Sequence, residues 1–192
     1  SWWHGLQHGL AIITAAVPIA YKLKIQCIYI ASSNSYKSPA FHFTCASDPS
    51  VDNKIKFSSG EVFHDAYELT RQEKVKVVVD HYSGAADPVH LRVCFKNESN
   101  CSRCEKCLRT MMGIVAEGAD PSKFGFQYTG DLSHHIKRCI EDEVKFFTQS
   151  VIVRYWEVIR ERMRENSRII NNIESFQWFL DYDFRREKKR AL

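Results

Sequence analysis

The chain has 192 residues, of which 44% are hydrophobic and 26% charged, with a formal net charge of +4. This composition is ordinary for a globular protein, and no internal repeat or low-complexity segment interrupts it. The longest apolar run, Leu10 to Ala20, contains Pro18 and falls well short of the ~20 residues that cross a bilayer, which excludes a transmembrane helix.

Neither a secretory signal nor the cysteine density of a small secreted protein is present. The chain opens Ser-Trp-Trp-His, without a basic region followed by an apolar one. Four of its seven cysteines crowd one loop, which differs from a disulfide framework spread over a small domain. We therefore expect a cytoplasmic protein. Because the chain begins at Ser1 and not at a methionine, we also expect that it could be part of a longer polypeptide.

The first third of the chain predicts part of an α/β fold. Residues 5–23 have the apolar pattern of a buried helix, which Pro18 should kink or split because it removes the hydrogen bond to the carbonyl of Thr14. The β-branched and aromatic run 25–31 is typical of a strand covered on both faces, as in a parallel sheet. A serine-rich loop follows, and a helix-to-strand step of this kind is a fragment of α/β architecture.

The middle of the chain predicts further short strands and a helix. Residues 53–59 and 61–66 are candidate strands in an otherwise irregular stretch. Thr70 to Glu73 is a capping box, so a helix should begin at Thr70, although the valines that follow could equally form a strand. Leu91 to Phe95 is expected to be a strand.

The remainder predicts helices. Glu105 to Glu117 should be helical, because Gly118 and Pro121 follow it as stop signals. From Asp131 onward the pattern is helical, and the methionine, tryptophan and phenylalanine residues there are expected in the core of a small helical appendage. The helices expected in this appendage cover residues 131–148, 150–166 and 168–182.

Four cysteines fall within fourteen residues: Cys94, Cys101, Cys104 and Cys107. Two Cys-x-x-Cys steps share Cys104, and such a step aims two thiolates at one point. Four thiolates complete the tetrahedral shell that zinc prefers, and since protein would fill every position, a structural zinc ion is predicted. An iron–sulfur cluster and a redox Cys-x-x-Cys pair are the alternatives.

Polar and basic residues around the cysteines fit a metal loop. Arg103, Lys106 and Arg109 are placed to offset the net negative charge of zinc bound to four thiolates. The site should join the end of a strand at Leu91–Phe95 to the start of a helix near Glu105. Turn-forming residues that can also supply hydrogen bonds around the metal are Asn97, Ser99, Asn100 and Ser102.

The order of these features resembles a known family. An apolar helix, a strand ending in a small polar loop and a capping-box helix precede Val93-Cys94-Phe95 and then Cys101-Ser102-Arg103-Cys104-Glu105-Lys106-Cys107-Leu108-Arg109. Over residues 5–112, this pattern is similar to the C-terminal half of the 7-cyano-7-deazaguanine synthase family. That family belongs to the PP-loop ATP pyrophosphatases of the adenine nucleotide alpha-hydrolase-like superfamily, and its zinc cysteines correspond to the four cysteines here.

The resemblance implies an ATP-dependent enzyme with zinc, and with ATP and magnesium, as cofactors. Members adenylate a carboxylate or similar oxygen of a small-molecule substrate, release pyrophosphate and let a nitrogen nucleophile displace AMP. Residues 1–125, with the zinc loop 94–107, would be a partial α/β domain built on a Rossmann-like parallel sheet. Residues 126–192 would form a helical C-terminal extension.

The phosphate-binding loop of that family, Ser-Gly-Gly-x-Asp-Ser after the first strand, is not found in the chain. The nearest match is Ser83-Gly84-Ala85-Ala86-Asp87-Pro88, in which alanine replaces the second glycine and proline the last serine. We expect this segment to be an ordinary loop. Either the true loop lies upstream of Ser1 or the chain is a non-catalytic relative, so its own enzyme activity is left open and no catalytic residue is assigned.

Three residues are candidates for contact with nucleotide or substrate. Ser32 and Ser33 follow a strand at its carboxyl end, where α/β folds place ligands. His8 falls near the arginine that the family carries at the head of its apolar helix. With His4 it has the i, i+4 spacing of a shared ligand site or of a structural hydrogen-bonded pair. Loop carboxylates that could contact substrate, but are more simply solvated, are Asp48 and Asp52.

A zinc-containing interaction or scaffold module without catalysis is the main alternative. Nucleic acid could be bound through Tyr36, Lys37 and the aromatic residues at 41–43, together with the basic tail 185–190. Such a tail is more simply a solvated terminus. The helices after Asp131 could instead pack on a partner subunit or on a second copy of the chain, and an exposed apolar stripe there would favour this hypothesis.

Overall fold

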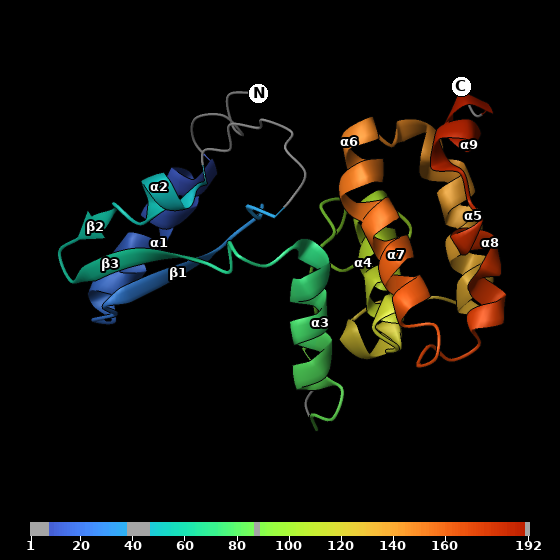
Figure 1. Ribbon diagram of the computed structural model, residues 1–192. Coiled ribbons are helices and arrows are strands. Elements are labelled where there is room, and N and C mark those ends of the chain that lie inside the picture. Colours follow the sequence, from blue (N-terminus) through green and yellow to red (C-terminus); the bar gives the residue numbers. More distant parts are fainter. Residues whose placement is uncertain (1–7, 38–46, 87–88, 191–192) are drawn as a thin grey trace. The chain divides into compact units, whose positions relative to one another are not determined.

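The computed structural model describes residues 8–37, 47–86 and 89–190 (Figure 1). It divides into two compact units, residues 1–71 and 72–192, which are described separately below. His4, the aromatic residues at 41–43, Asp87 and Pro88 lie outside the described residues. The domain boundary expected after residue 125 falls inside the second unit, because residues on both sides of it share one core.

The first unit contains a mixed sheet with the strand order β1-β3-β2. β1 (Cys27–Ala31) runs parallel to β3 (Gly60–Asp65), whereas β2 (Lys56–Phe57) runs antiparallel to β3. The strands expected at 25–31, 53–59 and 61–66 are thus confirmed, the second of them over two residues only. The general α/β class is confirmed as well, but the expected Rossmann-like parallel sheet is wrong for the described strands. The reason is that the chain turns directly from β2 into β3, and so short a connection can join only antiparallel strands.

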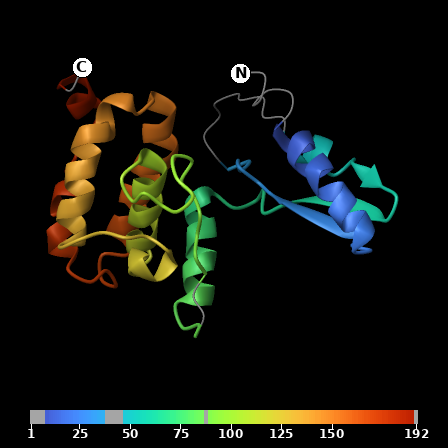
Figure 2. The ribbon, with the colours of Figure 1, turned by 180° about the vertical axis from the view of Figure 1, so that it is seen from behind.

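Helix α1 (His8–Lys22) lies along one face of this sheet (Figures 1 and 2). Ile13 of α1 packs with Ile30 of β1 and Val62 of β3 in a small buried core. The helix continues through Pro18, so the expected split does not occur, although part of its surface is exposed instead of buried. The apolar side chains exposed on α1 are Leu10, Ile12, Ile19 and Tyr21.

The opposite face of the sheet is open in the described structure. Tyr29 of β1 is 68% exposed and Phe63 of β3 is 48% exposed, and their rings meet edge to face with centroids 5.6 Å apart. A parallel strand pair is ordinarily covered on both faces. The expectation that 25–31 would be covered on both sides is therefore wrong for this unit as described.

Gly60 begins β3 where the backbone of Gln26 passes close by. A Cβ added at Gly60 would lie 1.8 Å from the carbonyl oxygen of Gln26, and the N–H of Glu61 donates to that same oxygen at 2.9 Å. Gly60→Ala is therefore expected to force the start of β3 away and to lower the free energy of unfolding of the first unit by about 2 kcal/mol. Urea unfolding, with hydrogen exchange at the strand amides, measures this loss.

Gly84→Ala is the matched control for Gly60→Ala, because an added Cβ at Gly84 meets no atom within 4 Å. It should change stability by less than about 0.5 kcal/mol. Equal stability of the two variants would contradict the close approach at Gly60.

The second unit is helical. The valines after Thr70 lie in α3 (Arg71–Tyr82) and not in a strand, as the capping box indicated. The helix expected at 105–117 is confirmed as α4 (Glu105–Ala116), and Gly118 follows it with φ +78°. The other helices are α5 (Leu132–Glu143), α6 (Gln149–Val151), α7 (Glu157–Glu165), α8 (Gln177–Leu180) and α9 (Phe184–Arg190).

Short irregular turns connect these helices. A π-helical segment, Ile152–Trp156, joins α6 to α7, so the helix expected at 150–166 is confirmed as one composite element. The helix expected at 168–182 is not continuous, because Asn172 takes a left-handed φ of +53° before α8 begins. The 3-10 turns are Pro121–Phe124, Val144–Phe146 and Ile173–Phe176.

Helix α4 lies at the centre of this unit, with every residue from Cys107 to Ala116 buried. Its core is shared with Phe126, Ile136 and Trp156, so residues before and after 125 pack together. This continuous core is why the division falls ahead of α3 and not after residue 125.

Exposed apolar side chains are few among the described helices after Asp131. Of the large hydrophobic residues in that stretch, Phe146 and Ile169 are exposed, and they form no stripe along one helix. The feature that would have favoured a scaffold surface there is therefore missing. In the part of the chain that the structure describes, no helix combines the length and the apolar character needed to span a bilayer.

Candidate metal centre

The Sγ atoms of Cys94, Cys101, Cys104 and Cys107 all lie within 4.8 Å of one another. The Sγ atom of Cys107 is 3.9 Å from that of Cys101 and 3.6 Å from that of Cys104, so these thiols are free and not disulfide-bonded. In a tetrahedral zinc site, bonds of about 2.3 Å separate neighbouring sulfurs by roughly 3.8 Å. The donor set and its spacing therefore fit one tetrahedral metal ion.

The chain brings the four sulfurs together from two local structures. Cys94 ends an extended segment, while Cys104 is the N-cap of α4 and Cys107 lies in its first turn. Ser102 takes a left-handed φ of +52° in the short loop between Cys101 and Cys104, which lets the Cys-x-x-Cys turn fold back on itself. Cys94, Cys104 and Cys107 are buried, so three of the sulfurs belong to the protein core.

The strand expected at Leu91–Phe95 is wrong, because a side chain satisfies the backbone that a neighbouring strand would have paired. Asn100 Oδ1 accepts hydrogen bonds from the N–H groups of Val93 at 3.0 Å and Cys94 at 3.4 Å. Its Nδ2 donates to the carbonyl of Leu91 at 2.6 Å. This one side chain therefore fixes the segment that carries Cys94.

Local hydrogen bonds and burial act in opposite directions on the thiols. Backbone N–H groups of Cys101, Lys96 and Asn97 lower the pKa of Cys94 to about 6. Burial raises the pKa of Cys104 and of Cys107. A cation among the sulfurs would stabilise all four thiolates, and the N-terminus of α4 adds to the positive potential there.

The expected basic neighbours are present, and their described contacts hold the loop against the core. Lys106 Nζ lies 3.1 Å from the ring centroid of Phe95, which is otherwise exposed. The guanidinium of Arg109 is buried, lies 3.5 Å from the carboxylate of Glu105 and stacks on Tyr155 at 4.0 Å. The first contact ties the metal loop to α4, and the second ties α4 to the π-helical segment Ile152–Trp156.

His135 is a residue of this site that sequence reasoning missed. It lies in the first turn of α5, and its Nε2–H donates to the carbonyl of Ser102 at 2.9 Å. The Oγ of Ser102 accepts a hydrogen bond from the N–H of Gln127, also at 2.9 Å. Two hydrogen bonds, from His135 and from Gln127, thus stabilise the strained turn at Ser102. No local sequence pattern predicts either of them.

The candidate ligand residues of the first unit occupy separate elements. Ser32 is buried directly after β1, and its N–H donates to the carbonyl of Asp65 at 2.9 Å. Ser33 is exposed beside it, and His8 is the first residue of α1. The structure confirms that both serines lie at the carboxyl end of a parallel strand.

The two loop carboxylates have different surroundings. Asp48 is the N-cap of α2 (Pro49–Asp52), and its side chain accepts a hydrogen bond from the N–H of Ser50. Asp52 is fully buried, where its Oδ2 accepts from Ser47 Oγ at 2.8 Å and lies 2.7 Å from Nδ1 of His64. The solvated interpretation is wrong for Asp52. Buried and exposed residues alternate along β3, and His64 lies on the same buried face as Val62.

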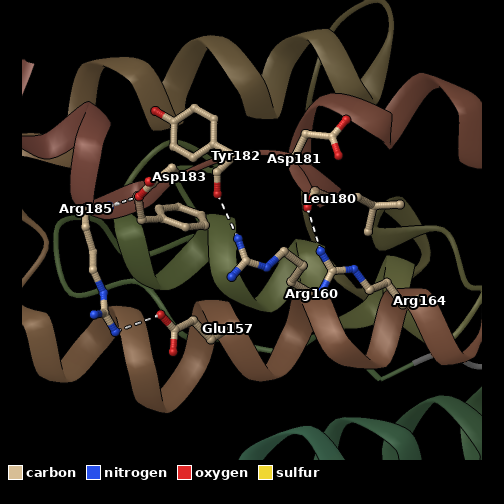
Figure 3. Close-up of a pocket in the computed structure, with 9 residues that line it drawn as sticks. Glu157, Arg160, Arg164, Leu180, Asp181, Tyr182, Asp183 and Arg185 are labelled. Carbon is tan, nitrogen blue, oxygen red and sulfur yellow. Dashed lines mark hydrogen bonds and ion pairs between the residues drawn. The ribbon is translucent and has the colours of Figure 1, made fainter.

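A cavity of about 490 Å³ lies between α7 and the segment that joins α8 to α9 (Figure 3). Arg160 donates to the carbonyl of Tyr182 at 2.8 Å, and Arg164 donates to that of Leu180 at 2.9 Å. These arginines therefore satisfy carbonyl groups near the end of α8. The charged lining residues balance in sign, which gives the cavity no preference for an anion: Arg160, Arg164, Arg185, Glu157, Asp181 and Asp183.

Comparisons of the chain with protein-family models, with curated proteins and with solved structures found no match. The candidate metal site is therefore inferred from the positions of its four sulfur atoms.

Proposed function

We propose that Cys94, Cys101, Cys104 and Cys107 hold a structural zinc ion. The observation that carries this proposal is the mutual approach of four sulfurs to within 4.8 Å. In an iron–sulfur cluster the thiolates bind different iron atoms around a larger core, so sulfurs this close favour a single ion. With four thiolates bound, zinc has no position left for water or substrate, which supports a structural role.

We further propose that the chain is the C-terminal part, or a relative, of an ATP-dependent adenylating enzyme that acts on a carboxylate-type substrate. Support comes from the cysteine spacing that resembles the PP-loop ATP pyrophosphatases, and from the parallel pair β1 and β3. Ser32 and Ser33 lie at the carboxyl end of that pair, where α/β proteins bind ligands.

The chemistry of such an enzyme sets what the complete site must do. A substrate carboxylate oxygen attacks the α-phosphorus of ATP, and the bond to pyrophosphate breaks. A nitrogen nucleophile then attacks the acyl carbon, and AMP leaves with the oxygen. In this proposal Ser32 and Ser33, at the carboxyl end of β1, bind and orient the substrate, while zinc stabilises the helical unit without taking part in bond making.

An interaction module is the second candidate, and the exposed apolar surface of the first unit favours it. Tyr29 and Phe63 on the sheet, with Ile19 and Tyr21 on α1, expose apolar area that a second polypeptide could cover. Nucleic acid is less favoured, since the basic tail in α9 already makes ion pairs. Salt-sensitive binding of single-stranded RNA by the chain would reverse this preference.

Native and denaturing mass spectrometry of the chain tests the metal directly. We expect the native mass to exceed the denatured mass by one zinc ion per chain. Calorimetric titration with ATP and Mg²⁺ then tests the nucleotide. Zinc with ATP binding supports both parts of the proposal, and zinc without ATP binding leaves the structural ion and removes adenylation by this chain alone. A mass difference that matches iron and sulfide would overturn the zinc assignment.

A further inference from the structure

The first unit contains a buried histidine–carboxylate pair that the proposed function does not use. The side chains of His64 and Asp52 are 1% and 0% exposed, and 2.7 Å separates Nδ1 of the imidazole from Oδ2 of the carboxylate. Ser47 Oγ–H donates to the same oxygen at 2.8 Å, and Asn53 Oδ1 accepts from the N–H of His64 at 2.6 Å. The pair is therefore held by both strand and loop.

This arrangement decides which ring nitrogen is available. Since a carboxylate oxygen can only accept a hydrogen bond, the neutral imidazole must carry its proton on Nδ1. Nε2 then presents a lone pair. Among the described residues it has no hydrogen-bond partner although it is buried. A buried polar atom without a partner destabilises the fold, and a ligand group that donates a hydrogen bond to it would remove that cost.

The pair lies where a ligand is expected. His64 is the penultimate residue of β3, and it is paired in register with Ile30 of the parallel strand β1. Beyond this pair, the N–H of Ser32, just after β1, donates to the carbonyl of Asp65, the last residue of β3, at 2.9 Å. Ala66 follows with φ +57°, a strained conformation for a residue with a Cβ. Carboxyl ends of adjacent parallel strands are the usual ligand edge of α/β folds.

We propose that His64 is a ligand-binding residue that Asp52 positions. Its Nε2 accepts a hydrogen bond from an N–H or O–H group of a bound ligand and can take that proton. The proton then moves from the ligand nitrogen or oxygen to Nε2, and the bond it leaves keeps its electron pair on the ligand. The imidazolium formed is stabilised by the buried carboxylate of Asp52. This assignment rests on geometry and does not require that the ligand be adenylated.

Long-range ¹H–¹⁵N NMR of the full zinc-loaded chain tests the proposal without any substitution. The free chain should show Nδ1 of His64 protonated and Nε2 unprotonated. The probes are ammonium chloride, AMP, and ATP with Mg²⁺. We expect at least one of them to shift the Nε2 signal of His64 in a saturable manner. A signal that none of the three moves would overturn the proposal and leave the pair a structural one.

Two variants separate positioning from binding, each checked by its melting curve. Asp52→Asn preserves shape but should weaken binding of the active probe about tenfold, because the amide no longer fixes Nδ1–H. His64→Gln should abolish saturable binding of that probe, followed through the shifts of the amides of Ser32 and Asp65. His81→Gln, at an exposed histidine of α3, is the control and should bind as the parent chain does. Unchanged affinity in Asp52→Asn would refute positioning by Asp52.

The same spectra distinguish ligand binding at His64 from adenylation by this chain. If ATP with Mg²⁺ shifts the amides of Ser32 and Ser33 and none of the three probes moves the Nε2 signal of His64, adenylation stands and the assignment of His64 fails. If ammonium shifts Nε2 of His64 while ATP binds nowhere, the assignment stands and adenylation by this chain fails.

Discussion

Replacing Cys104 with serine is expected to remove the metal and to lower the free energy of unfolding of the second unit by on the order of 5 kcal/mol. Structural zinc contributes folding energy outright, and a domain has only about 5–15 kcal/mol in total. The loop depends on that contribution because residues 95–99 are all exposed and bury no apolar side chain. Without the ion, the segment of Cys94 would depend on weaker contacts, such as the hydrogen bonds of Asn100 and the contact of Lys106 with Phe95.

Thermal unfolding and zinc content, measured on the same samples, check this expectation. Hydrogen exchange should show loss of protection around residues 91–112, where the loop meets α4. Removing zinc from the parent chain with a strong chelator should have the same effect as the substitution. A Cys104→Ser chain that has lost its zinc but melts at the parent temperature would show that the ion is not structural.

Cys139→Ser is the matched control. Cys139 is a partly buried thiol of the same unit, on α5, and it lies outside the four-sulfur group, with its Sγ 3.9 Å from Nε2 of His135. We expect this variant to retain one zinc ion and to lose less than about 1.5 kcal/mol. Zinc loss in both variants would instead indicate a general sensitivity of the unit to cysteine replacement.

The four-cysteine cluster could be predicted because the residues that form it are close together in the sequence. Cys101, Cys104 and Cys107 are close in sequence, and the stop signals after Glu117 are local as well, so spacing alone indicated both the site and α4. The strand predicted at Leu91–Phe95 was wrong because strand formation depends on residues outside the segment. Large apolar residues at every second position, Leu91, Val93 and Phe95, suit a strand, but whether a strand forms depends on what pairs with its backbone, and here Asn100 does so.

Contacts between distant positions were beyond sequence reasoning. Asp52 and His64 are twelve positions apart, and a loop carboxylate with no visible partner is most simply read as solvated. His135 reaches Ser102 across 33 positions. The parallel pairing of β1 and β3 was consistent with the pattern, but the antiparallel return of β2 was decided by a turn whose residues, Ser58 and Ser59, are not strong hairpin signals.

Replacing Arg162 with methionine is expected to lower the free energy of unfolding of the second unit by about 3–5 kcal/mol. Its guanidinium forms two hydrogen bonds to Glu117, at 2.9 Å from Nε and 2.8 Å from Nη2, and these bonds raise the pKa of Arg162. The Glu117 side chain is only 3% exposed. Removing the arginine therefore leaves a buried carboxylate without its cation, which costs far more than an exposed ion pair contributes.

Position in the fold adds to this cost, because Glu117 joins three helices. Gln72 of α3 donates to its Oε1 at 2.8 Å, and Asn166 at the end of α7 donates to its Oε2 at 3.3 Å. Gln72 also donates to the carbonyl of Gly113 in α4 at 2.9 Å. A charge left unpaired at this junction would loosen the packing of α3 and α7 on α4.

A second substitution distinguishes the buried charge from lost packing. In the double variant Arg162→Met with Glu117→Gln, the neutral amide no longer needs a cation, so roughly 2 kcal/mol of the loss should return. Arg168→Met, at an exposed arginine beyond α7, should change stability by less than about 0.5 kcal/mol. Urea unfolding of the parent chain, Arg162→Met, Glu117→Gln and the double variant completes the cycle, and Arg168→Met is measured beside them. A double variant no more stable than Arg162→Met would mean that the arginine acts through its aliphatic packing, and that the charge of Glu117 is tolerated without it.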